Sequence, residues 1–100
     1  MATVTQHLDN IGALDHPPNA AMLSRIQGAI ASGRDLTPGE TNFMTHELTE
    51  ANLMNNGVEQ DLAHELAGQT HPTFGNYDPE VIKQFPEYFN SNWRAYWGIP

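Results

Sequence analysis

The sequence contains no cysteine and few basic residues. Without cysteine, disulfides and thiolate metal sites are excluded. Twelve acidic residues give a net charge of −8 against four basic ones, Arg25, Arg34, Lys83 and Arg94. Proteins that hold nucleic acid by charge need Lys and Arg to neutralise phosphates. The composition therefore argues against that class and favours a basic protein partner, a metal ion or a small substrate.

Long apolar runs are also absent. No run of about 18 apolar residues is present, so we expect no membrane insertion. The first residues, MATVTQHLDNIG, lack the basic region and apolar core of a signal peptide. The 39% of hydrophobic residues suffices for one modest core. We predict an irregular lead-in over residues 1–18 and a single soluble helical domain over 19–100.

Helical signals dominate the rest of the chain. Thr37-Pro38-Gly39-Glu40 combines an N-cap, a proline at the first helical position and a capping-box glutamate. No segment alternates with period two for long enough to form a strand. The pattern predicts an all-α bundle of four to five short helices without a sheet. The expected helical segments are residues 19–33, 38–55 and 58–70, then 79 to about 85, and an aromatic stripe from Phe85 to the end.

One carboxylate falls on an apolar helix face. On a helical wheel of residues 38–55, Glu47 lies between Met54 and Ala51. His46 and Glu50 lie one turn apart on the shoulder of this face. A buried carboxylate is costly unless it is paired, hydrogen-bonded, protonated or bound to metal. Glu47 therefore needs a partner.

The helix over residues 58–70 offers such partners. Its predicted apolar face consists of Val58, Leu62 and Leu66. His64 and His71 project from another side. The short Asn56-Gly57 connection predicts antiparallel packing on the preceding helix. This packing would bring the two histidines to the acidic shoulder.

Two chemistries fit this cluster. A divalent metal, zinc or magnesium, could be bound with Glu47 as the base that acts on a bound water. Its ligands would be Glu50 and His71, with His46 or His64. Alternatively, Glu47, His46 and His64 could perform general acid–base catalysis without metal.

One sequence motif and three residues outside the cluster complete the set of candidates. The segment HELTE resembles the zinc-hydrolase pattern His-Glu-x-x-His, with Glu50 at the second histidine position. Arg94 could bind an anionic substrate, although pairing with a surface carboxylate is the preferred interpretation. His7 and His16 lie in the lead-in and receive no role.

From about Leu36 to Gly98 the chain resembles the C-terminal toxin domains of bacterial polymorphic toxins, of the Rhs-repeat and contact-dependent inhibition type. The segments that carry this resemblance are LTPGETNFMTHELTEANLM, AHELAGQTHP, NYDPEVIKQFPEYFN and NWRAYWG. The resemblance implies an antibacterial effector that is delivered from a producer cell into the cytoplasm of a competing bacterium. It also implies a cognate immunity protein as partner. Many such domains are nucleases, but this acidic chain would need metal or a local basic patch to approach the phosphates of a nucleic-acid substrate.

Three functions remain in competition at this point. We favour a toxin hydrolase, with or without metal. The alternative is an acidic helical inhibitor or binding module, similar to an immunity protein or a nucleic-acid mimic. The third is an assembly domain whose aromatic C-terminal helix forms an interface.

Overall fold

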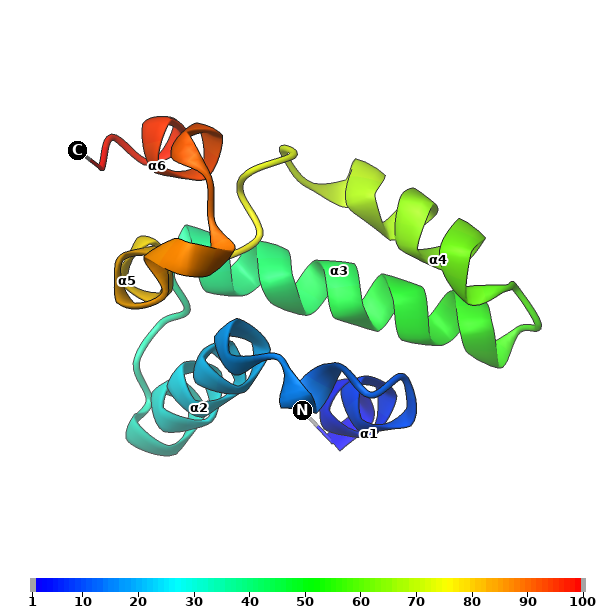
Figure 1. Cartoon of the computed structure of the whole chain (residues 1–100). Helices are drawn as coiled ribbons and strands as arrows, with labels where there is room; N and C mark the ends of the chain where they lie inside the picture. Colours follow the sequence, from blue (N-terminus) through cyan, green and yellow to red (C-terminus); the bar gives the residue numbers. More distant parts are fainter. Residues whose placement is uncertain (1, 100) are drawn as a thin grey trace.

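Helix α3 (Pro38–Asn55) is the central element of the computed structural model, which describes residues 2–99 (Figure 1). Its N-terminus carries the predicted capping box. The Thr37 hydroxyl accepts a hydrogen bond from the Glu40 N–H, and the Glu40 carboxylate accepts one from the Thr37 N–H. At the other end, Asn56 caps the helix and Gly57 adopts a positive φ of 89°. The predicted bounds of this helix are therefore confirmed.

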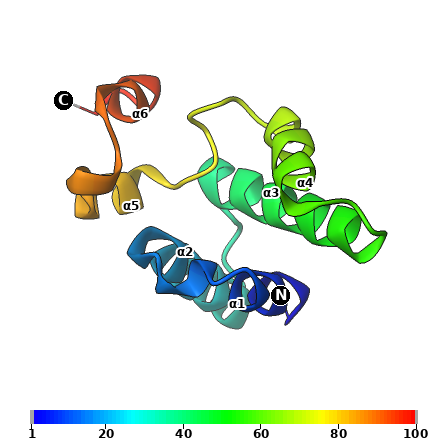
Figure 2. The same ribbon diagram turned by 45° about the vertical axis from the view of Figure 1, so that its right-hand side comes forward.

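The other helices pack around α3. Residues 2–99 contain six α-helices and no strand, which confirms the all-α prediction. The remaining helices are α1 (Ala2–Asn10), α2 (Pro17–Ser32), α4 (Gln60–Ala67), α5 (Pro79–Gln84) and α6 (Ser91–Tyr96). Short 3-10 turns lie at Ala13–Asp15, Gly68–Thr70 and Pro86–Tyr88. Helices α1 and α4 lie on opposite sides of α3, and α4 runs antiparallel to it (Figures 1 and 2).

The N-terminal segment differs from its prediction. Residues 2–10, expected to be irregular, form α1, and Ala13–Asp15 form a 3-10 turn. Val4 and Leu8 lie one turn apart and are fully buried. Each contributes about 1.5–3 kcal/mol of burial free energy, which outweighs the weak helical propensity of this polar segment. The prediction of an irregular lead-in was therefore wrong, because the burial of Val4 and Leu8 suffices to dock this segment as a helix.

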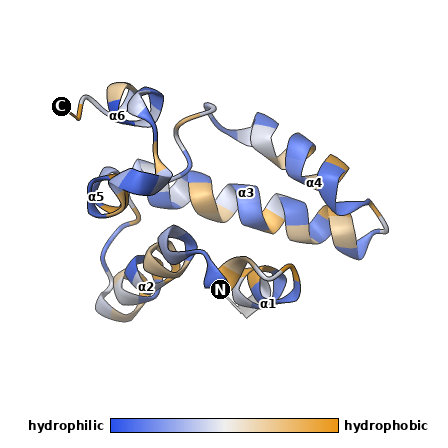
Figure 3. Ribbon diagram, in the orientation of Figure 1, coloured by the Kyte–Doolittle hydropathy of each residue, from blue (hydrophilic) through white to orange (hydrophobic). Residues whose placement is uncertain are grey.

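The hydrophobic core lies where α1, α2, α3 and α5 meet. Its buried residues are Val4, Leu8, Met22, Leu23, Ile26, Phe43 and Val81. The α3 helix alternates between hydrophobic and hydrophilic segments along its length (Figure 3). Its buried side chains include polar ones, and three of these, His46, Glu47 and Glu50, lie at or beside the candidate site. None of the helices in residues 2–99 combines the length and apolar character needed to cross a membrane.

Helix α4 contacts α3 through a different face from the predicted one. Ala63 and Ala67 are fully buried, whereas Leu62 and Leu66 are 49% and 37% exposed. Small alanine side chains allow the two backbones to approach closely. This close approach directs His64, which is on the same side as Ala67, toward α3.

The predicted aromatic stripe is interrupted. Pro86 starts a 3-10 turn, and α6 begins only at Ser91, after the N-cap Asn90. The rings nevertheless cluster, with Trp93 packed edge-to-face on Phe74, Tyr77 and Phe89. This cluster holds the loop before α5 against α6.

A buried ion-pair network joins the starts of α3 and α5. The fully buried Glu40 carboxylate contacts Arg34 at 3.0 Å and Arg25 at 3.2 Å. Arg25 also contacts Asp78 at 3.3 Å, and the Thr37 hydroxyl donates to Asp78 at 2.7 Å. Burial alone would raise the pKa of Glu40, but the hydrogen bonds and charges of its partners hold it below the ordinary value. The network fixes the end of α3 that precedes the site.

Candidate metal centre

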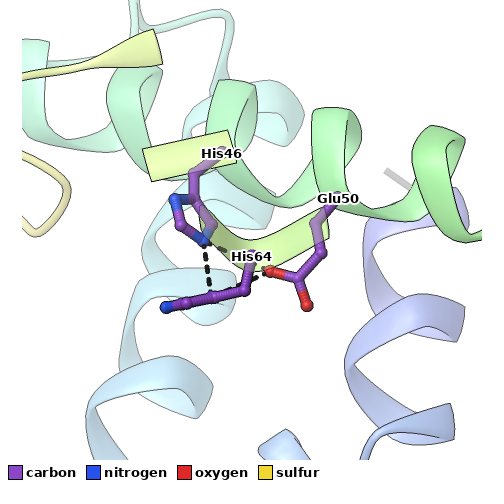
Figure 4. A group of neighbouring side chains, drawn as sticks. All are labelled: His46, Glu50 and His64. Atoms are coloured by element: carbon purple, nitrogen blue, oxygen red, sulfur yellow. Dashed lines mark hydrogen bonds and ion pairs between the residues drawn. The ribbon is translucent and has the colours of Figure 1, made fainter. Parts of the chain in front are cut away.

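Three side chains from two helices converge beside the middle of α3. His46 and Glu50 are presented one turn apart by α3, and α4 supplies His64 (Figure 4). His46 Nε2 lies 3.3 Å from His64 Nδ1 and 3.3 Å from Glu50 Oε2. His64 Nδ1 lies 3.1 Å from Glu50 Oε2. The predicted approach of His64 to the acidic shoulder is thus present in the structure.

This triangle has the dimensions of a metal site. Nitrogen and oxygen ligands about 2.0–2.2 Å from a tetrahedral ion lie about 3.3–3.6 Å from one another. The three observed separations, 3.1–3.3 Å, are close to this value. Two imidazoles and one carboxylate are also a ligand set typical of catalytic zinc sites, with a further position left open.

His71 sets the tautomer of His46. Its Nδ1 lies 2.7 Å from the Pro72 carbonyl oxygen, which can only accept, so Nδ1 carries the proton. Burial lowers the pKa of His71, and the charges of His46 and His64 lower it further. The hydrogen bond to Pro72 opposes this shift. The neutral ring then accepts from His46 Nδ1 at 2.9 Å. In the neutral form of His46, this tautomer directs the lone pair of Nε2 toward Glu50 and His64.

Glu50 remains a carboxylate in this environment. Burial would raise its pKa, but its contacts with His46 and His64 and the charges of His64 and His7 lower it. When His46 is neutral with its proton on Nδ1, a lone pair of Nε2 faces this anionic oxygen. Only a proton or a cation between these atoms makes such a contact favourable.

Glu47 lies on the α1 side of Glu50 instead of facing His64 and His71. Its Oε2 is 3.6 Å from His7 Nε2, and His7 Nε2 is 3.2 Å from Glu50 Oε1. Burial, together with the negative charge of Glu50, raises the pKa of Glu47 to about 8. The sequence correctly indicated that this carboxylate is buried, but it missed His7 as the partner. The signal was available: His7 lies three residues after Val4 and next to Leu8, on the buried side of α1.

A cleft of about 340 Å³ opens beside the triangle. It is lined by His46, His64, Gly68, His71, Thr73, Asn76, Tyr77 and Trp93. The His64 side chain is 69% exposed, so the triangle is accessible from solvent. Asn76 Oδ1 is buried and has no hydrogen-bond partner within residues 2–99, and its role could not be foreseen from the sequence.

The remaining candidate, Arg94, lies outside this cleft. Its guanidinium contacts the Phe89 carbonyl oxygen at 3.5 Å, near the start of α6. The structure brings His46, Glu50, His64 and His71 together, and places Glu47 behind Glu50 with His7. Comparisons with protein-family models, with curated proteins and with solved structures found no match to this chain. The functional argument therefore rests on the site itself.

Proposed function

We propose that this chain is a divalent-metal-dependent hydrolase. The observation that supports it is the triangle of His46 Nε2, Glu50 Oε2 and His64 Nδ1, with separations of 3.1–3.3 Å, at the edge of an open cleft. Zinc fits these ligands better than magnesium, because imidazole suits zinc whereas magnesium prefers oxygen ligands. His71 is assigned as the outer partner that orients His46 instead of as a ligand.

A bound divalent ion would lower the pKa of a water and polarise the bond to be cleaved. In hydrolysis the water oxygen bonds to the carbon or phosphorus under attack, and the departing atom takes up a proton. The cleft would hold the substrate between Trp93 and the histidines. Asn76 Oδ1 can accept a hydrogen bond from it. Glu47 does not line this cleft, so we assign it no part in proton transfer there.

The resemblance to polymorphic toxins supplies the biological setting of the proposal. In that setting the chain would act in the cytoplasm of a competing bacterium and be neutralised by a cognate immunity protein. A nucleic-acid substrate would need the metal to offset the repulsion between phosphates and a chain of charge −8. We therefore place nucleic acid among the substrates to be tested.

The test uses the purified full chain and the variant Glu50→Gln, with Glu65→Gln as a matched control on the exposed surface of α4. Zinc binding is measured by calorimetry, and hydrolysis is measured on nitrophenyl esters, a phosphodiester, a peptide, RNA and DNA. We expect zinc binding and hydrolysis from wild type and Glu65→Gln, and neither from Glu50→Gln. A wild-type chain that binds no divalent ion would refute the proposal.

The toxin setting has a separate test. The chain is expressed in bacteria with and without the gene adjacent to its own. Growth arrest by wild type but not by Glu50→Gln, relieved by the neighbouring gene, supports the toxin role. Normal growth in every case would contradict the toxin role. The proposed metal-dependent hydrolysis would then be decided by the zinc-binding and hydrolysis assays alone.

A further inference from the structure

A second group of possible ligands lies on the opposite side of Glu50 from the first. His7 from α1 and Glu47 and Glu50 from α3 place ligand atoms within 4.8 Å of one another. His7 Nε2 is 3.2 Å from Glu50 Oε1 and 3.6 Å from Glu47 Oε2. The three residues are only 6%, 7% and 1% exposed. This group is more deeply buried than the triangle that includes His64.

None of the three converging atoms makes a hydrogen bond. His7 Nε2, Glu47 Oε2 and Glu50 Oε1 are all buried and lack a hydrogen-bond partner within the described part of the chain. The short distance between His7 and Glu50 therefore does not reflect a hydrogen bond between them. Each unsatisfied buried polar atom costs about 1–3 kcal/mol. A cation bound between the three atoms would satisfy all of them at once, whereas protonation of His7 would supply ion pairs but no hydrogen bond.

Glu50 links this group to the first triangle. Its Oε2 contacts His46 and His64, while its Oε1 contacts His7. Figure 4 shows one carboxylate oxygen at the histidines and the other directed away from both rings. A carboxylate arranged in this way can bind one cation through each oxygen. Two-metal hydrolytic sites hold their ions about 3.5–4 Å apart.

We infer that His7, Glu47 and Glu50 Oε1 form a second divalent-cation site, and that Glu50 bridges it to the ion held by His46 and His64. This inference rests on the proposed function and extends it to a two-metal centre. Glu47 is then a metal ligand instead of a base. With Glu47 ionised as a ligand, the two ions together offset the charges of Glu47 and Glu50, whereas an ion at the first triangle contacts only Glu50.

A second cleft provides access to this site. It has a volume of about 380 Å³, and its lining includes His7, Gln6, Asn10, Ala51 and Asn55. It lies between α1 and the C-terminal half of α3. The two ions would therefore be reached from opposite sides of α3, one from each cleft.

The test is the number of zinc ions bound per full-length chain, measured by native mass spectrometry and calorimetry. We expect two ions for wild type, one for His7→Ala and one for His64→Ala. His16→Ala is the matched histidine control and should bind two, because His16 packs against Tyr88 away from both sites. Circular dichroism establishes that each variant keeps its helical content.

The outcomes separate the inference from the proposed function. A wild-type chain with one ion, lost in His64→Ala and retained in His7→Ala, would overturn the second site and leave the first intact. A chain that binds no ion would overturn both. If His7→Ala does not fold, electron paramagnetic resonance of Mn²⁺ bound to wild type decides between the two cases. A bridged pair of ions gives an exchange-coupled spectrum when two equivalents of Mn²⁺ are added per chain. Spectra of isolated Mn²⁺ at that ratio would overturn the bridge.

Discussion

The imidazole of His7 and the carboxylate of Glu50 lie 3.2 Å apart, although the helices that carry them, α1 and α3, are separated in the sequence by α2. The contact joins α1 to the middle of α3 and places a histidine on the opposite side of Glu50 from His46 and His64. Glu50 therefore contacts histidines from three helices, α1, α3 and α4. The candidate metal centre depends on the correct docking of all three.

His64 is the ligand whose loss should separate function from stability. Because its side chain is 69% exposed, His64→Ala should change the free energy of unfolding by no more than about 0.5 kcal/mol. Zinc affinity at the first site should fall by more than about 100-fold, since a direct ligand contributes more than an outer partner. Urea unfolding and calorimetry measure the two quantities. Unchanged zinc affinity would exclude His64 as a ligand.

His71 should act through His46. His71→Ala removes the acceptor of the His46 Nδ1 proton and should weaken zinc binding by about 10–100-fold. His71→Gln retains an acceptor oxygen and should recover part of this affinity. If His71 serves only to stabilise the loop, both variants would unfold more easily and bind zinc as wild type does.

The Glu40 network should make stability depend on pH. The pKa of Glu40 is lowered in the fold, so its contribution is complete above the unfolded value of 4.5 and is lost as pH falls through the folded value. Glu40→Gln should destabilise the protein by about 1–3 kcal/mol at pH 7. The difference between variant and wild type should shrink in thermal unfolding below pH 4.5. A difference that is independent of pH would contradict the role of the ionised carboxylate.

The packing of α4 on α3 gives a matched pair of substitutions. Ala63→Leu introduces bulk where the side chain is fully buried and should cost about 1–3 kcal/mol. Leu62→Ala, at the neighbouring and half-exposed position, should cost much less. Denaturant unfolding compares the two. The reverse order would mean that α4 packs through its leucine face.

Substrate recognition should depend on Asn76 and not on Arg94. Asn76→Ala removes an unpaired acceptor from the cleft and should raise KM with little change in kcat. Arg94→Ala alters a residue outside the cleft and should leave both parameters unchanged. Steady-state kinetics on whichever substrate is hydrolysed provide the comparison.

An acidic binding module, by contrast, would retain its full function in every histidine variant.

Local signals predicted much of the fold. The capping box of Thr37 and Glu40 fixed the start of α3, and Asp78 followed by Pro79 fixed the start of α5. Such signals involve residues a few positions apart, so they can be recognised without knowledge of the tertiary structure. Helix α1 lacks a signal of this kind. It is helical because Val4 and Leu8 are buried against other helices, which periodicity over nine residues did not reveal.

The candidate site, like the fold, was predicted where the signals were local and missed where they were not. The helical wheel placed Glu47 on a buried face, and the short turn after α3 brought His64 to Glu50. The partner of Glu47 was missed because His7 approaches from a helix distant in sequence. The face of α4 was misassigned because hydrophobicity favoured Leu62 and Leu66, whereas close helix packing selected alanine. Both errors concern contacts between elements, which a single sequence encodes only weakly.

The central claim is that His46, Glu50 and His64 bind a divalent ion. Crystals of the full chain grown with zinc, measured above and below the zinc absorption edge, test it most directly. We predict an anomalous difference peak about 2.0–2.2 Å from His46 Nε2, Glu50 Oε2 and His64 Nδ1. Ordered side chains at these positions without such a peak would contradict the claim.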